Sequence, residues 1–156
     1  MKLLKIICYA WLGFGLLSCD SNRVYEQYET IPDFEWNQAD TLRFEVDITD
    51  TIQANNVFIN LRNSGDYEYS NLWLFVKRTS PDNQSIERKL EFNLADETGD
   101  WYGSGFGDLF DLQIPMEQKV VFPKSGKYVY EIVQGMYDVK LKGIANVGIR
   151  IEKENQ

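Results

Sequence analysis

Residues 41–49 read TLRFEVDIT, where the apolar residues Leu42, Phe44, Val46 and Ile48 alternate with charged ones. Successive side chains of a β-strand point to opposite faces of its sheet, so a period of two indicates a strand with one buried face. The segment therefore predicts a β-strand that covers a hydrophobic core.

The same alternation recurs along the rest of the chain. It is found at residues 57–61, 72–76, 90–94, 128–132 and 147–151. Turn-forming residues separate these runs at 63–66, 80–83, 97–100, 123–126 and 142–143. No stretch of ten residues has the 3.6 period of a helix. Short strands with frequent turns predict an all-β fold, a single antiparallel β-sandwich that is immunoglobulin-like or jelly-roll-like.

We expect this sandwich to span residues 24–156, with residues 24–36 forming an edge strand or a covering loop. The inward faces of the strands predict a buried set: Phe44, Val46, Ile59, Leu61, Leu72, Leu74, Ile132, Val147 and Ile149. A slip of one residue in register would expose the whole set. Trp73 and Phe75 alternate with this set, and we expect them to be buried too.

The amino-terminal segment resembles a bacterial lipoprotein signal. Two lysines, Lys2 and Lys5, precede an apolar run of 12 residues at 6–17, which is too short to span a membrane. Residues 16–19 read LLSC, a lipobox-like quartet with a small residue before the cysteine. We expect residues 1–18 to be removed, Cys19 to carry the lipid, and residues 19–23 to form a lipidated tether. The alternative is an ordinary cleaved signal with an incidental cysteine. Diacylglycerol on the thiol plus an amide-linked acyl chain suffices for stable membrane attachment.

Charge and composition exclude several functions. The 156 residues carry 24 acidic and 16 basic side chains, for a net charge of −8. Loss of Lys2 and Lys5 with the signal leaves −10, which repels nucleic acid and anionic lipid headgroups. The chain has no histidine, and its two cysteines are Cys8 and Cys19. The commonest general base and metal ligand is therefore absent, and a disulfide within one mature chain is impossible.

Two segments invite a chemical interpretation. Residues 99–108 contain four glycines but lack the lysine and following helix of a phosphate loop, so a tight surface loop crossing between sheets is the simpler hypothesis. Carboxylates flank this loop without the spacing of a known calcium loop; they are Asp96, Glu97, Asp100, Asp108 and Asp111. A solvated acidic face is the simpler alternative to calcium binding. We expect no catalytic residue, no metal site and no cofactor.

Aromatic side chains are the best candidates for binding. They make up 14% of the chain, and two groups lie beside turns. Exposed aromatic residues bind sugars and protein partners. The candidate partner-binding residues are Tyr67, Tyr69, Trp101 and Tyr102.

Taken together, the motifs resemble the gliding-motility lipoprotein GldH family of the Bacteroidota. The matching stretches are 19–25 (CDSNRVY), 58–67 (FINLRNSGDY), 69–75 (YSNLWLF), 100–103 (DWYG), 105–108 (GFGD), 122–123 (FP), 126–128 (GKY), Glu131, 134–136 (QGM) and 147–153 (VGIRIEK). The resemblance covers nearly the whole mature chain in order, and none of its motifs is catalytic.

The resemblance implies an envelope lipoprotein that supports the gliding machinery, which in this phylum is coupled to type IX secretion. The expected partners are the membrane, through the lipid on Cys19, and other envelope or gliding-machinery proteins. No acidic run of the kind that resembles a surface-export signal follows Cys19, which favours the periplasmic side. Our first hypothesis is a non-enzymatic scaffold. The rival is a glycan- or peptide-binding module, which a concave, exposed aromatic strip would favour over a flat face or a free sheet edge.

Overall fold

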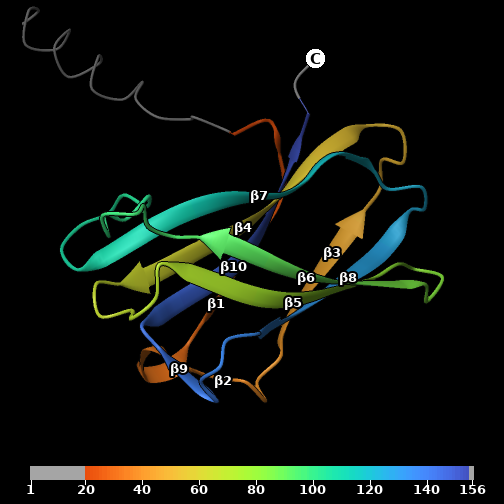
Figure 1. The fold of residues 1–156 in the computed structure, drawn as a ribbon. Coiled ribbons are helices and arrows are strands. Elements are labelled where there is room, and N and C mark those ends of the chain that lie inside the picture. The colour runs from red at the N-terminus through yellow and green to blue at the C-terminus, as the bar shows by residue number, and fades with distance from the viewer. Residues whose placement is uncertain (1–19, 155–156) are drawn as a thin grey trace, which may run out of the picture.

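The chain folds as one long antiparallel double ribbon that is rolled into two packed sheets (Figure 1). The structure is a computed structural model that describes residues 20–154; the expected signal peptide and Cys19 lie outside the described residues. The strands of the first half are β1 (Arg23–Thr30), β2 (Glu35–Asn37), β3 (Leu42–Ile48), β4 (Ala54–Ser64) and β5 (Asn71–Thr79). Those of the second half are β6 (Ser85–Asn93), β7 (Leu109–Val121), β8 (Gly126–Gln134), β9 (Lys140–Lys142) and β10 (Ile144–Lys153).

Each strand of the first half pairs antiparallel with one of the second half. The pairs are β1 with β10, β2 with β9, β3 with β8, β4 with β7 and β5 with β6. The ribbon turns at residues 80–84, where the Ser80 amide donates to the Gln84 carbonyl over 2.9 Å. Rolling this ribbon adds the β4–β10 and β5–β8 pairs, which complete two four-stranded sheets.

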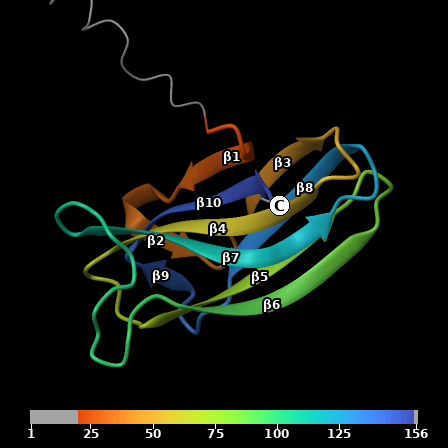
Figure 2. The same ribbon diagram turned by 90° about the horizontal axis from the view of Figure 1, so that it is seen from above.

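Sheet I has the strand order β1-β10-β4-β7, and sheet II has the order β3-β8-β5-β6. Figure 2 shows the four strands of sheet I lying side by side in that order. Eight strands in this arrangement form a jelly roll, so the structure selects this alternative over the immunoglobulin-like one. The short β2–β9 ribbon joins the two sheets at one end, next to a 3-10 turn, η2 (Pro32–Phe34). The structure contains no α-helix within residues 20–154, and no helix there is long and apolar enough to cross a membrane.

The core lies between the two sheets, and its residues confirm the predicted alternation of buried and exposed positions along the strands. All nine residues predicted to be buried are at most 2% exposed. For residues 24–36 the sequence left open an edge strand or a covering loop. The structure confirms the edge strand, which is β1 (Arg23–Thr30). Trp36 also joins the core, where its indole Nε1 donates to the Asp40 carbonyl over 3.0 Å.

One expectation about β5 was wrong, and one strand was not predicted. Phe75 is 46% exposed and Trp73 is only partly buried, because Leu72, Leu74 and Val76 take the inward positions of β5. The sequence reading also omitted β7, the longest strand, which contains Pro115. Proline cannot donate to a neighbouring strand, and β7 tolerates it because it lies at the edge of sheet I.

Candidate partner-binding site

The four candidate aromatic residues lie at one end of the sandwich. Three loops meet there: residues 65–70 after β4, 94–108 between β6 and β7, and 135–139 between β8 and β9. Hydrogen bonds join them, because the Gly65 amide donates to the Asp108 carbonyl (2.8 Å) and the Leu94 amide to the Ser70 carbonyl (2.7 Å). The Tyr69 hydroxyl donates to Asp138 Oδ2 over 2.7 Å. We call this surface the loop end.

An aromatic row forms the base of the loop end. The ring centroids are 5.8 Å apart for Tyr67 and Tyr69, 6.3 Å for Tyr67 and Trp101, and 5.7 Å for Trp101 and Phe110. These spacings are those of favourable edge-to-face and tilted aromatic pairs. The row joins loops that are far apart in sequence into one packed unit.

The structure gives the four candidates different roles. Tyr67 is 4% exposed and its hydroxyl donates to the Asn71 carbonyl over 2.8 Å, so it supports the surface and cannot contact a partner directly. Burial raises the pKa of Tyr67, and the hydrogen bond to Asp138 raises that of Tyr69, so both hydroxyls remain protonated at neutral pH. Trp101 and Tyr69 are partly buried, whereas Tyr102 is 58% exposed.

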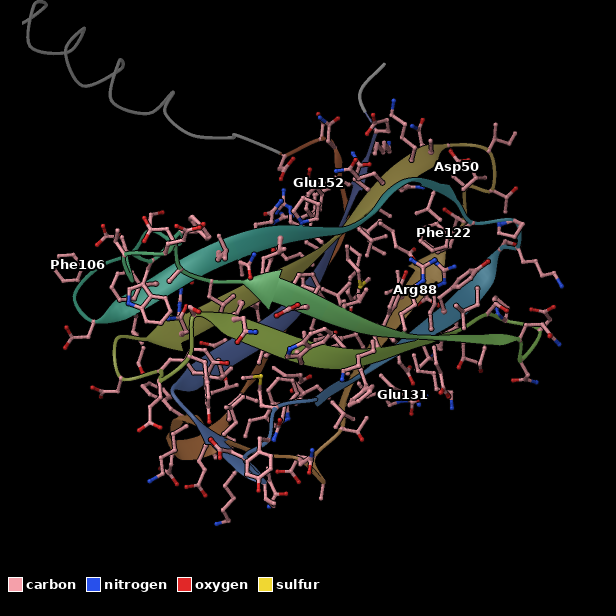
Figure 3. The ribbon with its side chains drawn as sticks, in the orientation of Figure 1. Asp50, Arg88, Phe106, Phe122, Glu131 and Glu152 are labelled. Atoms are coloured by element: carbon pink, nitrogen blue, oxygen red, sulfur yellow. The ribbon has the colours of Figure 1, made fainter. Side chains whose placement is uncertain are left out.

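The sequence reasoning missed two more exposed aromatic residues. Phe106 is 97% exposed in the glycine-rich loop, and Tyr137 is 98% exposed in the loop that carries Asp138. Phe106 projects from one end of the molecule, whereas Asp50 lies at the other end (Figure 3). The available signal for both was an aromatic residue within a turn-rich segment, next to glycine or aspartate.

The glycine-rich loop crosses between the sheets, as expected. It leads from β6 of sheet II to β7 of sheet I. A Cβ at Gly103 would lie 2.9 Å from the Asp111 carbonyl oxygen, and one at Gly105 only 1.9 Å from that of Leu109. The missing side chains therefore let the loop pack directly against the start of β7.

The carboxylates around this loop do not converge. Asp96 Oδ1 accepts hydrogen bonds from the Thr98 amide (2.8 Å), the Thr98 hydroxyl (2.7 Å) and the Asp100 amide (3.0 Å), and these bonds lower its pKa. Asp111 instead forms an ion pair with Arg62, with 2.6 Å between Nε and Oδ1. Among residues 20–154 no group of three or more histidine, cysteine or acidic side chains is arranged to hold a metal ion.

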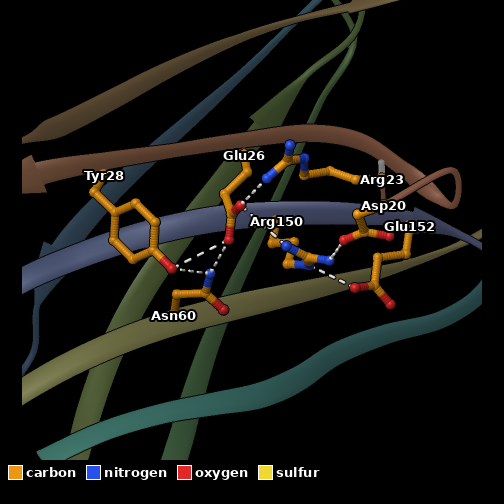
Figure 4. Close-up of polar contacts among 7 residues, drawn as sticks. All are labelled: Asp20, Arg23, Glu26, Tyr28, Asn60, Arg150 and Glu152. Carbon is orange, nitrogen blue, oxygen red and sulfur yellow. Dashed lines mark hydrogen bonds and ion pairs between the residues drawn. The ribbon is translucent and has the colours of Figure 1, made fainter. Parts of the chain in front are cut away.

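A second polar cluster lies on the outer face of sheet I and includes Asp20, the first residue that the structure describes (Figure 4). Its centre is Arg150 on β10, whose guanidinium contacts the carboxylates of three residues. They are Asp20, Glu26 at 3.0 Å and Glu152. Asp20 directly follows Cys19 in the sequence, so this cluster holds the residue next to the predicted lipid. We call it the anchor cluster.

The local chain path makes the anchor cluster possible. The Arg23 amide donates to the Asp20 carbonyl over 3.2 Å, and the Lys153 amide donates to the Asn22 carbonyl over 2.8 Å. Residues 20–23, the described part of the expected tether, are therefore attached to the side of β10. The hydrogen bond from Arg150 lowers the pKa of Asp20. Burial disfavours the ionised form of Glu26, but hydrogen bonds from Arg23 and Arg150 outweigh it and lower that pKa as well.

The anchor cluster and the loop end lie at opposite ends of sheet I. β1 begins at Arg23 opposite Glu152, and Glu152 pairs with Asn56 near the start of β4. The loop end begins after Ser64, where β4 stops. The eight residue steps of β4 from Asn56 to Ser64, at a rise of about 3.3 Å each, separate the two ends by about 26 Å.

A third surface lies on the outer face of sheet II. An open depression of about 440 Å³ is lined partly by Phe75, Val133 and Glu131. The Lys89 ammonium lies 4.5 Å from the centroid of the Trp73 ring and 5.6 Å from that of Phe75. This cation–π contact covers part of the aromatic surface.

The fold defines a class: a small all-β domain of two packed, antiparallel, four-stranded sheets. The chain belongs to the GldH lipoprotein family, whose family model matches residues 23–151. It is therefore a membrane-anchored lipoprotein of the cell envelope, from a family of motility components rather than a known enzyme family.

Two relatives support this assignment. A gliding motility lipoprotein GldH homolog of Christiangramia forsetii is 40% identical over 145 residues, which are 88% of each chain. The gliding motility lipoprotein GldH of Flavobacterium johnsoniae is 30% identical over 147 residues, 90% of this chain and 91% of that protein.

Among solved structures, matches include a chain of the VP2 subviral particle of infectious bursal disease virus and a chain of the T13 IBDV viral particle. The TM-scores are 0.38 and 0.41, with 15% and 16% identity. Each match covers 91% of this chain, but only 36% and 34% of the viral chain. These scores are too low to support a structural or functional argument.

Proposed function

We propose that this protein is a non-enzymatic, partner-binding component of the gliding machinery and the associated type IX secretion machinery. In this proposal a lipid on Cys19 holds the sandwich at the membrane, on the periplasmic side of the envelope. The loop end binds another envelope protein. The observation that carries the proposal is the separation of the two ends: Asp20 is attached at one end of sheet I, and the exposed aromatic residues lie at the other.

The attachment of Asp20 explains how such a protein would work. A free tether would let the domain turn in all directions, whereas the contacts of residues 20–23 with β10 leave only one peptide bond between the lipidated residue and a fixed point on sheet I. Sheet I would then extend from the membrane, with the loop end held about 26 Å from the anchor cluster. A preorganised orientation lowers the entropic cost of binding a partner.

The test is Cys19→Ala, expressed at wild-type level in the parent organism. The domain has no substitute anchor, because its net charge of −10 after signal removal repels anionic lipid. We expect the variant to leave the membrane fraction or to remain an uncleaved precursor, to stay folded, and to lose gliding and secretion. A variant that leaves the membrane fraction yet functions normally would refute the membrane-tethered scaffold.

The second candidate function is a glycan- or peptide-binding module that uses the depression on sheet II. The exposed Phe75 beside Lys77 and Glu131 favours it, because carbohydrate sites combine an aromatic face with polar side chains. Phe75→Ser would then abolish binding to envelope glycan and leave the loop end unaffected. Unchanged retention on an affinity column of purified peptidoglycan would eliminate this use of sheet II for that glycan.

A further inference from the structure

The loop end carries unbalanced negative charge. Its three loops contain seven carboxylates and neither lysine nor arginine; the acidic residues are Asp66, Glu68, Asp96, Glu97, Asp100, Asp108 and Asp138. None of the seven forms an ion pair with another residue in the range 20–154. On the sheets, by contrast, acidic side chains such as Glu26, Glu45 and Glu117 lie against basic ones. The charge of the loop end is therefore not neutralised within the described fold.

The same surface exposes aromatic side chains that have no role in the core. Tyr102, Phe106 and Tyr137 project from two of the three loops, and the row from Tyr67 to Phe110 holds those loops together. Large apolar side chains exposed on a packed base are typical of interaction sites, since leaving them in water is unfavourable. Carboxylates around such residues restrict which partner can approach.

We propose that the loop end is a docking surface for a protein that presents lysine and arginine side chains around apolar recesses. This inference rests on the proposed function and specifies its partner. Guanidinium and ammonium groups would pair with the free carboxylates and stack on the exposed rings, and the recesses would receive Phe106 and Tyr137. An anionic membrane or nucleic acid is excluded as the occupant, because its charge has the same sign as that of the loops.

The variants are chosen so that the fold is preserved. Four exposed carboxylates of the loop end that accept no side-chain hydrogen bond are replaced together: Asp66→Asn, Glu68→Gln, Glu97→Gln and Asp108→Asn. The control makes the same change in net charge on the faces of the sheets, with Glu29→Gln, Asp47→Asn, Glu87→Gln and Glu91→Gln. Asp96 and Asp138 are left unchanged because their hydrogen bonds shape the loops.

The readout is photo-crosslinking in living cells, with a photoreactive phenylalanine analogue at position 106 or 137 in the full lipidated chain. Position 52 is the control, because Ile52 is also highly exposed (87%) but lies beside Asp50, at the opposite end from Phe106. We expect positions 106 and 137 to give the same protein adduct and position 52 to lack it. Loss of four steering charges should lower the adduct yield at least about tenfold, while the control set leaves it unchanged.

Peptide mapping decides whether the partner is basic. The inference requires the crosslinked segment of the partner to lie in a surface with an excess of lysine and arginine. An adduct with an acidic or neutral surface, adducts only with lipid or glycan, or a yield equal in both charge variants would overturn it. So would the absence of an adduct in cells that glide. The proposed function fails separately, if Cys19→Ala cells glide and secrete normally.

Discussion

Replacing Arg150 with glutamine should destabilise the fold, because the glutamine cannot form the ion pairs of the anchor cluster. The guanidinium side chain is only 14% exposed and contacts Glu26, which is 18% exposed, along with two further carboxylates. Removing one partner from a buried pair costs about 3–5 kcal/mol, whereas exposed pairs contribute about 0–1 kcal/mol. The cluster lies between these limits, so we expect Arg150→Gln to lower the free energy of unfolding by about 2–3 kcal/mol.

The assay is urea unfolding of a soluble chain that has alanine at position 19 and no signal peptide. With an m-value of about 1.5 kcal/mol/M, the midpoint should fall by about 1.3–2 M. The matched control is Arg43→Gln, since Arg43 contacts Glu45 at 3.0 Å and Glu131 at 3.6 Å but is 53% exposed. That control should cost less than about 1 kcal/mol.

The pH dependence gives a second, independent readout. The folded-state pKa values of Asp20 and Glu26 are lowered, so their contribution to stability is complete above the unfolded pKa of about 4 and is lost as the pH falls through the folded values. The difference between wild type and Arg150→Gln should therefore shrink between pH 7 and pH 3. Equal losses for Arg150→Gln and Arg43→Gln at pH 7, or a difference that is constant with pH, would refute the argument.

Four further outcomes are expected. Leu74→Ala, at a core position with no exposed surface, should cost about 2–5 kcal/mol in the same urea assay, and a loss below about half a kcal/mol would contradict its place in the core. Gly143→Ala should destabilise more than Gly99→Ala: both positions have positive φ, but only at Gly143 would the new Cβ meet backbone, 2.7 Å from the Tyr67 Cα. Tyr69→Phe removes the bond to Asp138 and should cost about 1 kcal/mol, with faster amide exchange confined to residues 135–139. Purified residues 20–156, which contain neither histidine nor cysteine, should hold no zinc after dialysis and show no hydrolase activity; stoichiometric zinc by elemental analysis would contradict this.

Alternation predicted the sandwich because it reports directly on which side chains enter a core. Phe44, Ile59 and Leu74 needed no tertiary information to be placed. The same rule places Trp73 and Phe75 on the other face of β5. We expected them to be buried because aromatic side chains often fill a sandwich core, and this expectation contradicted the alternation. The solvent-facing side of a sheet can accommodate such rings when a lysine ammonium lies over them, as that of Lys89 does here.

The anchor cluster could not be predicted from the sequence, for a different reason. Asp20 and Arg150 are 130 residues apart, and only the pairing of β1 with β10 brings them together. Among 24 acidic and 16 basic residues, no local pattern selects this partnership. The β1–β10 pair in turn depends on the whole ribbon. Each strand of the first half must pair with its partner in the second half, starting from the turn at residues 80–84.

The position of Tyr137 follows from the number of strands that precede it. Consecutive strands of an antiparallel sandwich alternate in direction, so the loops that follow alternate strands gather at the same end. The loops after β4, β6 and β8 therefore share the loop end, and those after β5 and β7 lie at the opposite end. Without β7 the count after β6 would be wrong by one, and residues 135–139 would fall at the opposite end. Including β7 brings Tyr137 beside the loops of Tyr69 and Phe106, so the proposed docking surface depends on one edge strand that tolerates a proline.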